Sequence, residues 1–191
     1  MVLFISCYTD LYEEEAKGLV ETLEKFNLKH NVARLESLGS WNLNTKLKTT
    51  WIKKNLQEQQ EPVVWLDADA RVEQYPQLFF DFKDVDFACH MRRGVELLSG
   101  ALYFGNNEKT HEIVEQWIAV NARKPAVFDQ RNLHEVVKTR QEKINWHLLP
   151  PTYCLFDLIV KYEGVKDSPV IWHRQASRRL RGLANMEGRK K

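Results

Sequence analysis

The chain has 191 residues, of which 43% are hydrophobic and 28% are charged, and its formal net charge is +2. This composition predicts one globular domain and excludes a disordered or fibrous chain. The three cysteines show no Cys-x-x-Cys spacing, which argues against a disulfide framework and for a reducing compartment. Because no apolar run approaches the roughly 18 residues of a membrane span, we expect a cytoplasmic protein with no transmembrane segment.

The first half of the sequence alternates between patterns typical of strands and of helices. Residues 2–7 form a continuous apolar run, which indicates a buried strand rather than a signal peptide. Apolar side chains at helical spacing follow over residues 16–26, and a weaker strand pattern covers 31–36. A second helical pattern covers about 44–60, and a short apolar strand follows at 63–66.

The second half continues with further helices and strands. The predicted helices cover residues 75–82, the region around 113–118 and a segment that begins at 128, and the predicted strands cover 85–90, 99–105, 144–150 and 169–173. The alternation predicts an α/β fold with a Rossmann-like mixed, mainly parallel sheet that is flanked by helices. No linker rich in proline, glycine or serine divides the chain, so we expect a single domain.

Two carboxylates, Asp67 and Asp69, follow directly on the apolar strand in the segment VVWLDADARV. Ligands of open α/β sheets collect at the carboxyl ends of strands, and strand alternation directs both side chains to the same side. Carboxylates so close repel each other unless a cation or a proton lies between them, and a divalent cation that also binds phosphate resolves the repulsion. The structural alternative is an aspartate-rich turn. The strand that runs straight into the pair favours a functional site.

The same pair resembles the motif of haloacid-dehalogenase-like phosphatases, in which Asp67 would be the nucleophile and Asp69 its acid–base partner. That family carries the motif on its first strand and has Thr or Val two residues after the second aspartate. Here two predicted strands come first, and Arg71 stands at that position. The phosphatase is therefore the less favoured alternative.

Five segments, in this order, resemble the glycosyltransferases of the GT-A fold, and distantly the glycogenin-like transferases. They are VLFISCYTD, KLKTTWIKKNLQEQQEPVVWLDADA, SGALYFGN, FDQRNL and PVIWHRQASRR. The resemblance implies a GT-A-like catalytic domain over residues 1–172 and a basic segment, 173–191, that closes over a metal and diphosphate site. It also implies the transfer of a sugar from a nucleoside-diphosphate donor, UDP-linked by preference, to an acceptor hydroxyl on a glycan, a lipid-linked saccharide or a modified DNA base.

The resemblance further implies a bound Mn²⁺ or Mg²⁺. Asp69 is the expected direct ligand, and Asp67 is expected to bind the metal through water or to contact the ribose or donor sugar. His173 is the expected third ligand, since a neutral imidazole suits Mn²⁺. The alternative for His173 is a histidine at a strand end that bonds a backbone carbonyl.

Other residues are expected to hold the donor. They are Tyr8 and Thr9 at the base, Lys48 (with Lys46 as a competitor) at nucleotide or phosphate, Ser99 and Gly100 at the sugar, and Arg178, among neighbouring arginines, at the diphosphate. The alternatives are a rim aromatic for Tyr8, solvated helix residues for the lysines and a β-bulge for Gly100.

Asp129 and Gln130 are the expected catalytic residues near the anomeric carbon. Asp129 would act as a base or stabilise oxocarbenium charge, and Gln130 would stabilise that charge through its carbonyl. The alternative for Asp129 is a helix N-cap. Glycogenin-like enzymes have a second acid after this glutamine, whereas this chain has Arg131, so retention or inversion stays open.

The C-terminal end is basic: from His173 onward, seven Lys or Arg residues stand against a single Glu. Such a segment favours an anionic partner, which makes nucleic acid a possible acceptor or partner. The alternatives are a solvated terminus and a protein that keeps the fold as a non-catalytic nucleotide-binding or nucleic-acid-binding module.

Overall fold

The computed structural model describes residues 1–187 and contains one six-stranded sheet in the order β2-β1-β3-β6-β5-β7. The strands are β1 (Leu3–Tyr8), β2 (His30–Arg34), β3 (Val63–Leu66), β5 (Phe87–Arg92), β6 (Glu96–Phe104) and β7 (Trp146–Leu148). β1 is parallel to β2 and β3, and β7 is parallel to β5, whereas β6 is antiparallel to both of its neighbours. The predicted α/β fold with a mixed sheet is confirmed.

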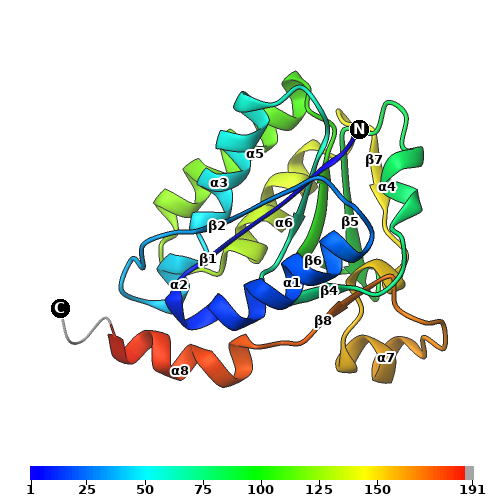
Figure 1. The fold of residues 1–191 in the computed structure, drawn as a ribbon. Helices are drawn as coiled ribbons and strands as arrows, with labels where there is room; N and C mark the ends of the chain where they lie inside the picture. The colour runs from blue at the N-terminus through cyan, green and yellow to red at the C-terminus, as the bar shows by residue number, and fades with distance from the viewer. Residues whose placement is uncertain (188–191) are drawn as a thin grey trace.

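Helices cover both faces of this sheet (Figure 1). The longer ones are α1 (Glu13–Lys25), α3 (Leu47–Glu58), α5 (Glu108–Arg123), α6 (Asp129–Arg140) and α8 (Ser177–Glu187). The shorter ones are η1 (Asp10–Tyr12), α2 (Trp41–Asn44), α4 (Gln77–Asp81), η2 (Pro151–Cys154) and α7 (Asp157–Glu163). Because successive strand residues point to opposite faces, Phe4 packs in a core with α1, α4 and α7, while Ile5 packs with α3, α5 and α6.

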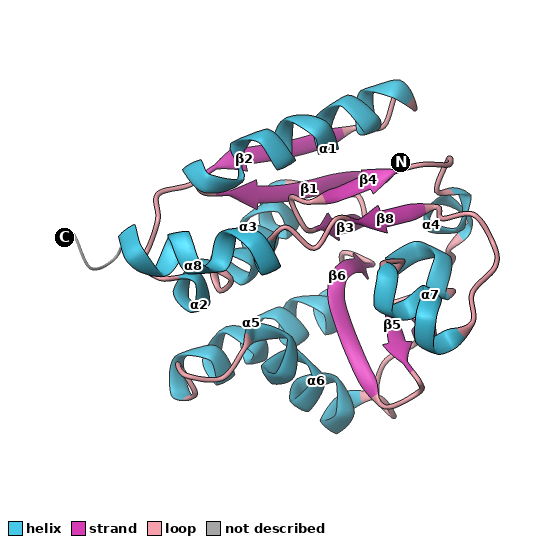
Figure 2. Cartoon of the chain, turned by 90° about the horizontal axis from the view of Figure 1, so that it is seen from below, coloured by secondary structure: helices cyan, strands magenta, loops and turns pink. Residues whose placement is uncertain are grey.

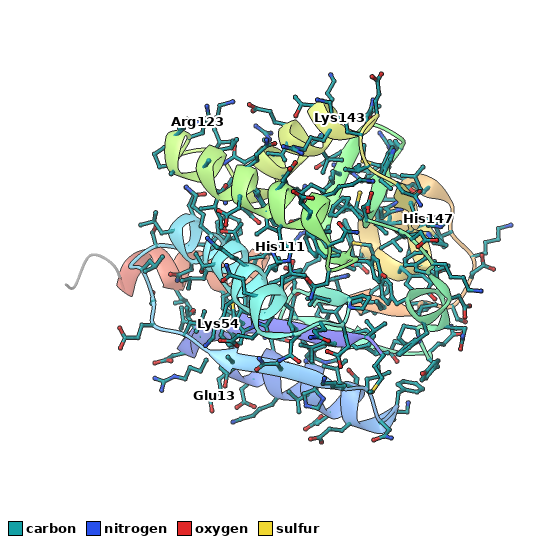
Figure 3. All side chains as sticks on the ribbon, turned by 90° about the horizontal axis from the view of Figure 1, so that it is seen from above. Glu13, Lys54, His111, Arg123, Lys143 and His147 are labelled. Carbon is teal, nitrogen blue, oxygen red and sulfur yellow. The ribbon has the colours of Figure 1, made fainter. Side chains whose placement is uncertain are left out.

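The outer faces of the helices are polar, as in an ordinary domain in water. Figure 3 shows Lys54 of α3 and Arg123 of α5 among the side chains seen from above, and both are exposed. Among the described residues, no helix combines the length and the apolar character that crossing a bilayer requires.

A second, two-stranded sheet joins the middle of the chain to its end. β4 (Ala70–Val72) pairs antiparallel with β8 (Ile171–His173), and Ala70 lies opposite His173. This pairing brings the late histidine beside the acidic pair, although about a hundred residues separate them in the sequence. The register of β4 and β8 therefore builds the candidate site.

The C-terminal segment continues from β8 into α8, which lies beside α2 and η1 (Figure 2). One buried carboxylate fastens it to α1: Glu15 lies 3.0 Å from Arg71, 3.7 Å from Arg174 and 2.9 Å from Arg179. We call these four residues the Glu15 cluster. The last residues of the predicted basic segment, 188–191, lie outside the described residues.

Replacing Glu15 with glutamine is expected to lower the free energy of unfolding by about 2 kcal/mol. The substitution leaves the Arg71 guanidinium, 11% exposed, without its ionic partner, while the more exposed Arg174 and Arg179 contribute less. Urea unfolding measures the change, and Glu21→Gln on the exposed face of the same helix is the matched control. Equal stability of the two variants would contradict a holding role for the cluster.

Candidate active site

A cavity of about 400 Å³ opens beside the carboxyl ends of β1 and β3, a volume typical of small-molecule sites. Ten of the predicted site residues line it: Tyr8, Thr9, Lys48, Asp67, Asp69, Ser99, Gly100, Asp129, Gln130 and His173. Arg178 does not; its side chain is exposed, and it follows the cavity-lining Ser177 at the start of α8. The structure thus gathers around one space residues from β1, α3, β6, α6 and β8, the turn between β3 and β4, and the residue after β1.

The acidic pair lies in the turn between β3 and β4, where the Ala70 N–H donates to the Asp67 carbonyl at 2.9 Å. The two side chains have different partners. Asp69 is buried, and its Oδ2 accepts a hydrogen bond of 2.7 Å from the Ala176 N–H. Asp67 is more exposed, and its Oδ1 accepts from Trp65 Nε1 and lies 2.9 Å from Lys48 Nζ. Asp69 therefore faces the C-terminal segment and Asp67 faces the sheet.

Asp67, Asp69 and His173 offer ligand atoms that all lie within 4.8 Å of one another, and His173 Nδ1 is 3.9 Å from Asp69 Oδ1. His173 is buried, yet its Nε2 has no hydrogen-bond partner within the described structure. A buried imidazole nitrogen without a partner is costly unless something binds it. Two carboxylates and an imidazole form a donor set that suits Mn²⁺, so the residues fit the expected metal.

The pKa of Asp69 lies below its ordinary value. Burial alone would raise it, but His173, the Ala176 N–H and the charge of Arg71 together outweigh burial. Asp69 is therefore ionised at neutral pH, as a metal ligand has to be.

Gly100 on β6 is in close contact with His173. A Cβ at this position would lie 2.8 Å from His173 Cε1 and 3.1 Å from Nδ1. The absence of a side chain therefore gives the imidazole its place, a reason for glycine that the sequence did not reveal.

Gly100→Ala is expected to weaken Mn²⁺ binding roughly tenfold to a hundredfold, because the new methyl group would displace the imidazole from its observed position. Titration with Mn²⁺, followed by the electron paramagnetic resonance of the free ion, measures the affinity. Gly182→Ala on α8 is the control, since a Cβ there meets nothing within 4 Å. Unchanged Mn²⁺ affinity in Gly100→Ala would argue against His173 as a ligand.

Lys48 of α3 lies at the centre of a buried polar network. Its Nζ lies 2.9 Å from Asp67 Oδ1 and 3.4 Å from Asp129 Oδ2, and it donates to Ser99 O at 3.0 Å and Ser99 Oγ at 3.1 Å. Burial by itself would lower the pKa of Lys48, but Asp67 and Asp129 outweigh it and raise the pKa above its ordinary value. Lys48 is therefore a permanent cation that links the acidic turn to the start of α6.

The ladder between β5 and β6 is irregular beside this network. Its register shifts between Cys89 and His90, which are opposite Leu102 and Leu98 respectively, so Ser99 falls in a bulged stretch of β6. The Ser99 carbonyl accepts from Lys48, and the Ser99 N–H donates to Gln130 Oε1 at 3.1 Å. The bulge turns two backbone groups of a strand toward side chains of the cavity.

Asp129 and Gln130 begin α6, and Phe128 is the residue at the N-cap. Asp129 is buried, and burial raises its pKa, although Lys48 opposes this effect. Gln130 is bonded at both ends of its amide, since its Nε2 also donates to Glu96 Oε1 at 3.2 Å. Asp129 is thus the buried acid of the cavity, and Gln130 is a fixed link between β6 and α6.

The end of the cavity near β1 is aromatic. Tyr8 and the buried Thr9 line this end, together with Tyr12, Trp41 and Phe128. The rings of Trp41 and Phe128 meet edge to face, with 5.4 Å between their centroids. The sequence analysis did not select Tyr12, Trp41 or Phe128, because each belongs to an element whose position depends on the tertiary fold.

No family model matches this sequence, and no curated protein is significantly similar to it. Solved structures are similar in fold. A glycosyltransferase involved in the glycosylation of the major capsid of PBCV-1 superposes with a TM-score of 0.73 at 14% identity, over 100% of this chain and 99% of that chain. The glycosyltransferase GlyE of Streptococcus pneumoniae superposes with a TM-score of 0.66 at 15% identity, over 98% of this chain and 61% of that chain.

A third match is the galactosyltransferase LgtC, solved with donor and acceptor sugar analogs, with a TM-score of 0.60 at 10% identity. This match covers 98% of this chain and 95% of that chain. Identities this low establish the fold and leave the chemistry to the site. The chain therefore has the fold of these solved glycosyltransferases, the GT-A fold that the sequence predicted.

Proposed function

We propose that this protein is a metal-dependent glycosyltransferase that moves a sugar from a nucleoside-diphosphate sugar, UDP-linked by preference, to an acceptor hydroxyl. The observation that carries the proposal is the convergence of Asp67, Asp69 and His173 at 4.8 Å or less beside the buried Lys48–Asp129 pair. The fold shared with solved glycosyltransferases supports it.

In this proposal Asp69 and His173 hold Mn²⁺ or Mg²⁺, and Asp67 completes the site directly or through water. When bound, the metal supplies positive charge for the diphosphate that leaves. The aromatic end with Tyr8 and Thr9 would receive the base and ribose. Ser99 and Gly100, in the bulged stretch of β6 that lines the cavity, would pass close to the donor sugar.

Asp129 is the proposed group nearest the reacting carbon, with Lys48 holding its carboxylate in place. Burial, together with the charge of Asp67, raises the pKa of Asp129, and Lys48 opposes this rise. Gln130, bonded to Ser99 and Glu96, would keep β6 at a fixed distance from α6 during the reaction. Arg178 would meet the diphosphate only after its exposed side chain turns toward the cavity.

The phosphatase alternative loses support in this geometry. The acidic pair follows β3, the third strand along the chain, and not the first strand that carries the motif in that family. Arg71, where that family has Thr or Val, pairs with Glu15. The nucleic-acid alternative rests on the charge of the C-terminal segment alone, in which Arg174 and Arg179 also pair with Glu15.

The test is incubation of the purified protein with UDP-, GDP- and ADP-linked hexoses and pentoses in the presence of Mn²⁺. We expect slow release of free nucleoside diphosphate from a UDP-sugar, and loss of the release with EDTA. Nucleotide binding without release points to the non-catalytic module. If thermal shift detects no nucleotide binding at all in the presence of Mn²⁺, the proposal is wrong.

A further inference from the structure

The cavity extends beyond the proposed donor site along β6. Gly100 and Leu98 line it, and so does Glu96 near the tip of the β5–β6 hairpin, together with Arg92, Phe156 and Leu158. Four residues of extended chain span at most about 14 Å, so Glu96 lies within that distance of Gly100 along the strand. We call this end of the cavity the β6 trough.

Contacts between the hairpin and α7 fix the walls of the trough. Glu163, the last residue of α7, lies 3.3 Å from His90 Nε2 on β5 and accepts a hydrogen bond of 3.0 Å from the Arg93 N–H. The Arg93 guanidinium also lies over the Tyr162 ring, 4.8 Å from its centroid. Because α7 and the hairpin are fastened together, the trough is a preformed surface.

Glu96 is the acidic group of the trough, and its side chain is 40% exposed. Gln130 Nε2 donates to its Oε1, and the Arg92 guanidinium pairs with its Oε2. An ionised carboxylate accepts about four hydrogen bonds, so roughly two acceptor positions remain for a ligand. The two protein partners hold these positions in a fixed orientation.

The floor beside Glu96 is apolar. Leu98 is 5% and Phe156 is 8% exposed, and Leu158 of α7 adds a partly buried side chain. A fixed carboxylate next to an apolar surface can bind a pyranose. The sugar hydroxyls donate hydrogen bonds to the carboxylate, and the C–H face of the ring packs on the apolar side chains. A phosphorylated group would instead meet the negative charge of Glu96, because Arg92 is already paired with it.

On the basis of the proposed transferase function, we propose that the β6 trough binds the acceptor and that the acceptor is a neutral saccharide whose hydroxyls bind Glu96. This assignment favours a glycan over a lipid-linked diphosphate saccharide or a nucleic acid. It gives Glu96, Leu98 and Leu158 the role of selecting the acceptor.

Saturation-transfer NMR tests the assignment with Mg²⁺ and UDP present. The probes are methyl glycosides of glucose, galactose, mannose and N-acetylglucosamine, together with the 6-phosphates of the same sugars. We expect at least one neutral glycoside to bind, and no phosphate to bind more strongly. Glu96→Gln should weaken binding of that glycoside at least about tenfold, because a hydrogen bond to a charged group is lost. The affinity for UDP should stay unchanged.

Leu158→Lys is the second variant, since a longer side chain on α7 narrows the trough, and Glu73→Gln at an exposed site is the control. UDP affinity verifies that each variant is folded. The assignment is overturned if neither trough variant weakens binding of the glycoside, or if only phosphorylated sugars bind. It is also overturned if the protein binds UDP but none of the probes. Failure to bind UDP, GDP and ADP alike instead refutes the transferase function, and the acceptor assignment falls with it.

Discussion

Asp69→Asn is expected to reduce Mn²⁺-dependent release of UDP from a UDP-sugar by at least about a hundredfold. Asparagine keeps the shape of the side chain and an oxygen that accepts from the Ala176 N–H, so the turn and the start of α8 stay in place. It removes the negative charge that faces His173. The substitution should therefore lower the affinity for Mn²⁺ and the rate of UDP release, and it should change the free energy of unfolding only slightly.

The measurement is the initial rate of UDP release, with Mn²⁺ affinity determined on the same preparations. Asp167→Asn, at an exposed position in the loop before β8, is the matched control and should behave like the unmodified protein. Near-normal turnover of Asp69→Asn would remove this residue from the metal site. An equal loss in both variants would show that the effect is not specific.

Lys48→Met is expected to lower the free energy of unfolding by about 3–5 kcal/mol, which is a large part of the stability of a small domain. Methionine fills a similar volume but leaves Asp67 and Asp129 without their shared cation. It also leaves the Ser99 carbonyl of the bulge without a donor. The cost is large because Lys48 and Asp129 are each only 7% exposed at the side chain.

Urea unfolding measures this cost, and Lys54→Met on the exposed side of the same helix should change stability by less than about 0.5 kcal/mol. The double variant Lys48→Met with Asp129→Asn should recover part of the loss, because a neutral amide replaces the unpaired buried carboxylate. A Lys48→Met protein as stable as the Lys54→Met control would contradict the network that links α3, β3 and α6.

Elements with strong local signals were predictable from the sequence. The strand at 63–66 is observed with the predicted limits as β3, because four apolar residues lie between a proline and an aspartate. The helices around residues 16–26 and 113–118 follow from apolar side chains at helical spacing and are observed as α1 and α5. In each of these cases the local pattern and the tertiary packing agree.

Elements that depend on distant contacts were not predictable. No sequence pattern predicted β4, a three-residue strand that exists because β8 pairs with it. The end of the chain was predicted only as a basic segment, whereas Ser177–Glu187 is a helix fastened through the Glu15 cluster. The helix α7 was not predicted either, although Asp157 in the first turn and Gly164 in a left-handed conformation after the last turn are recognisable helix signals.

The candidate site also combines features with a local sequence signal and features that depend on distant contacts. The strand-end position of Asp67 and Asp69 was visible in the sequence, but their separate partners, Lys48 and the Ala176 N–H, were not. Glu96 gave no signal at all, because its role depends on a bulge and on the start of α6. A single sequence marks residues at the ends of strong elements, and only the fold shows which of them share a cavity.

The central claim is that Asp69 and His173 together hold the metal that binds the donor diphosphate. A crystal structure with Mn²⁺ and UDP, using the anomalous signal of manganese, tests this claim most directly. The account predicts one Mn²⁺ within coordination distance of the Asp69 carboxylate and the His173 imidazole, with the UDP diphosphate on its open side. A manganese peak elsewhere, or UDP bound away from this cavity, would contradict it.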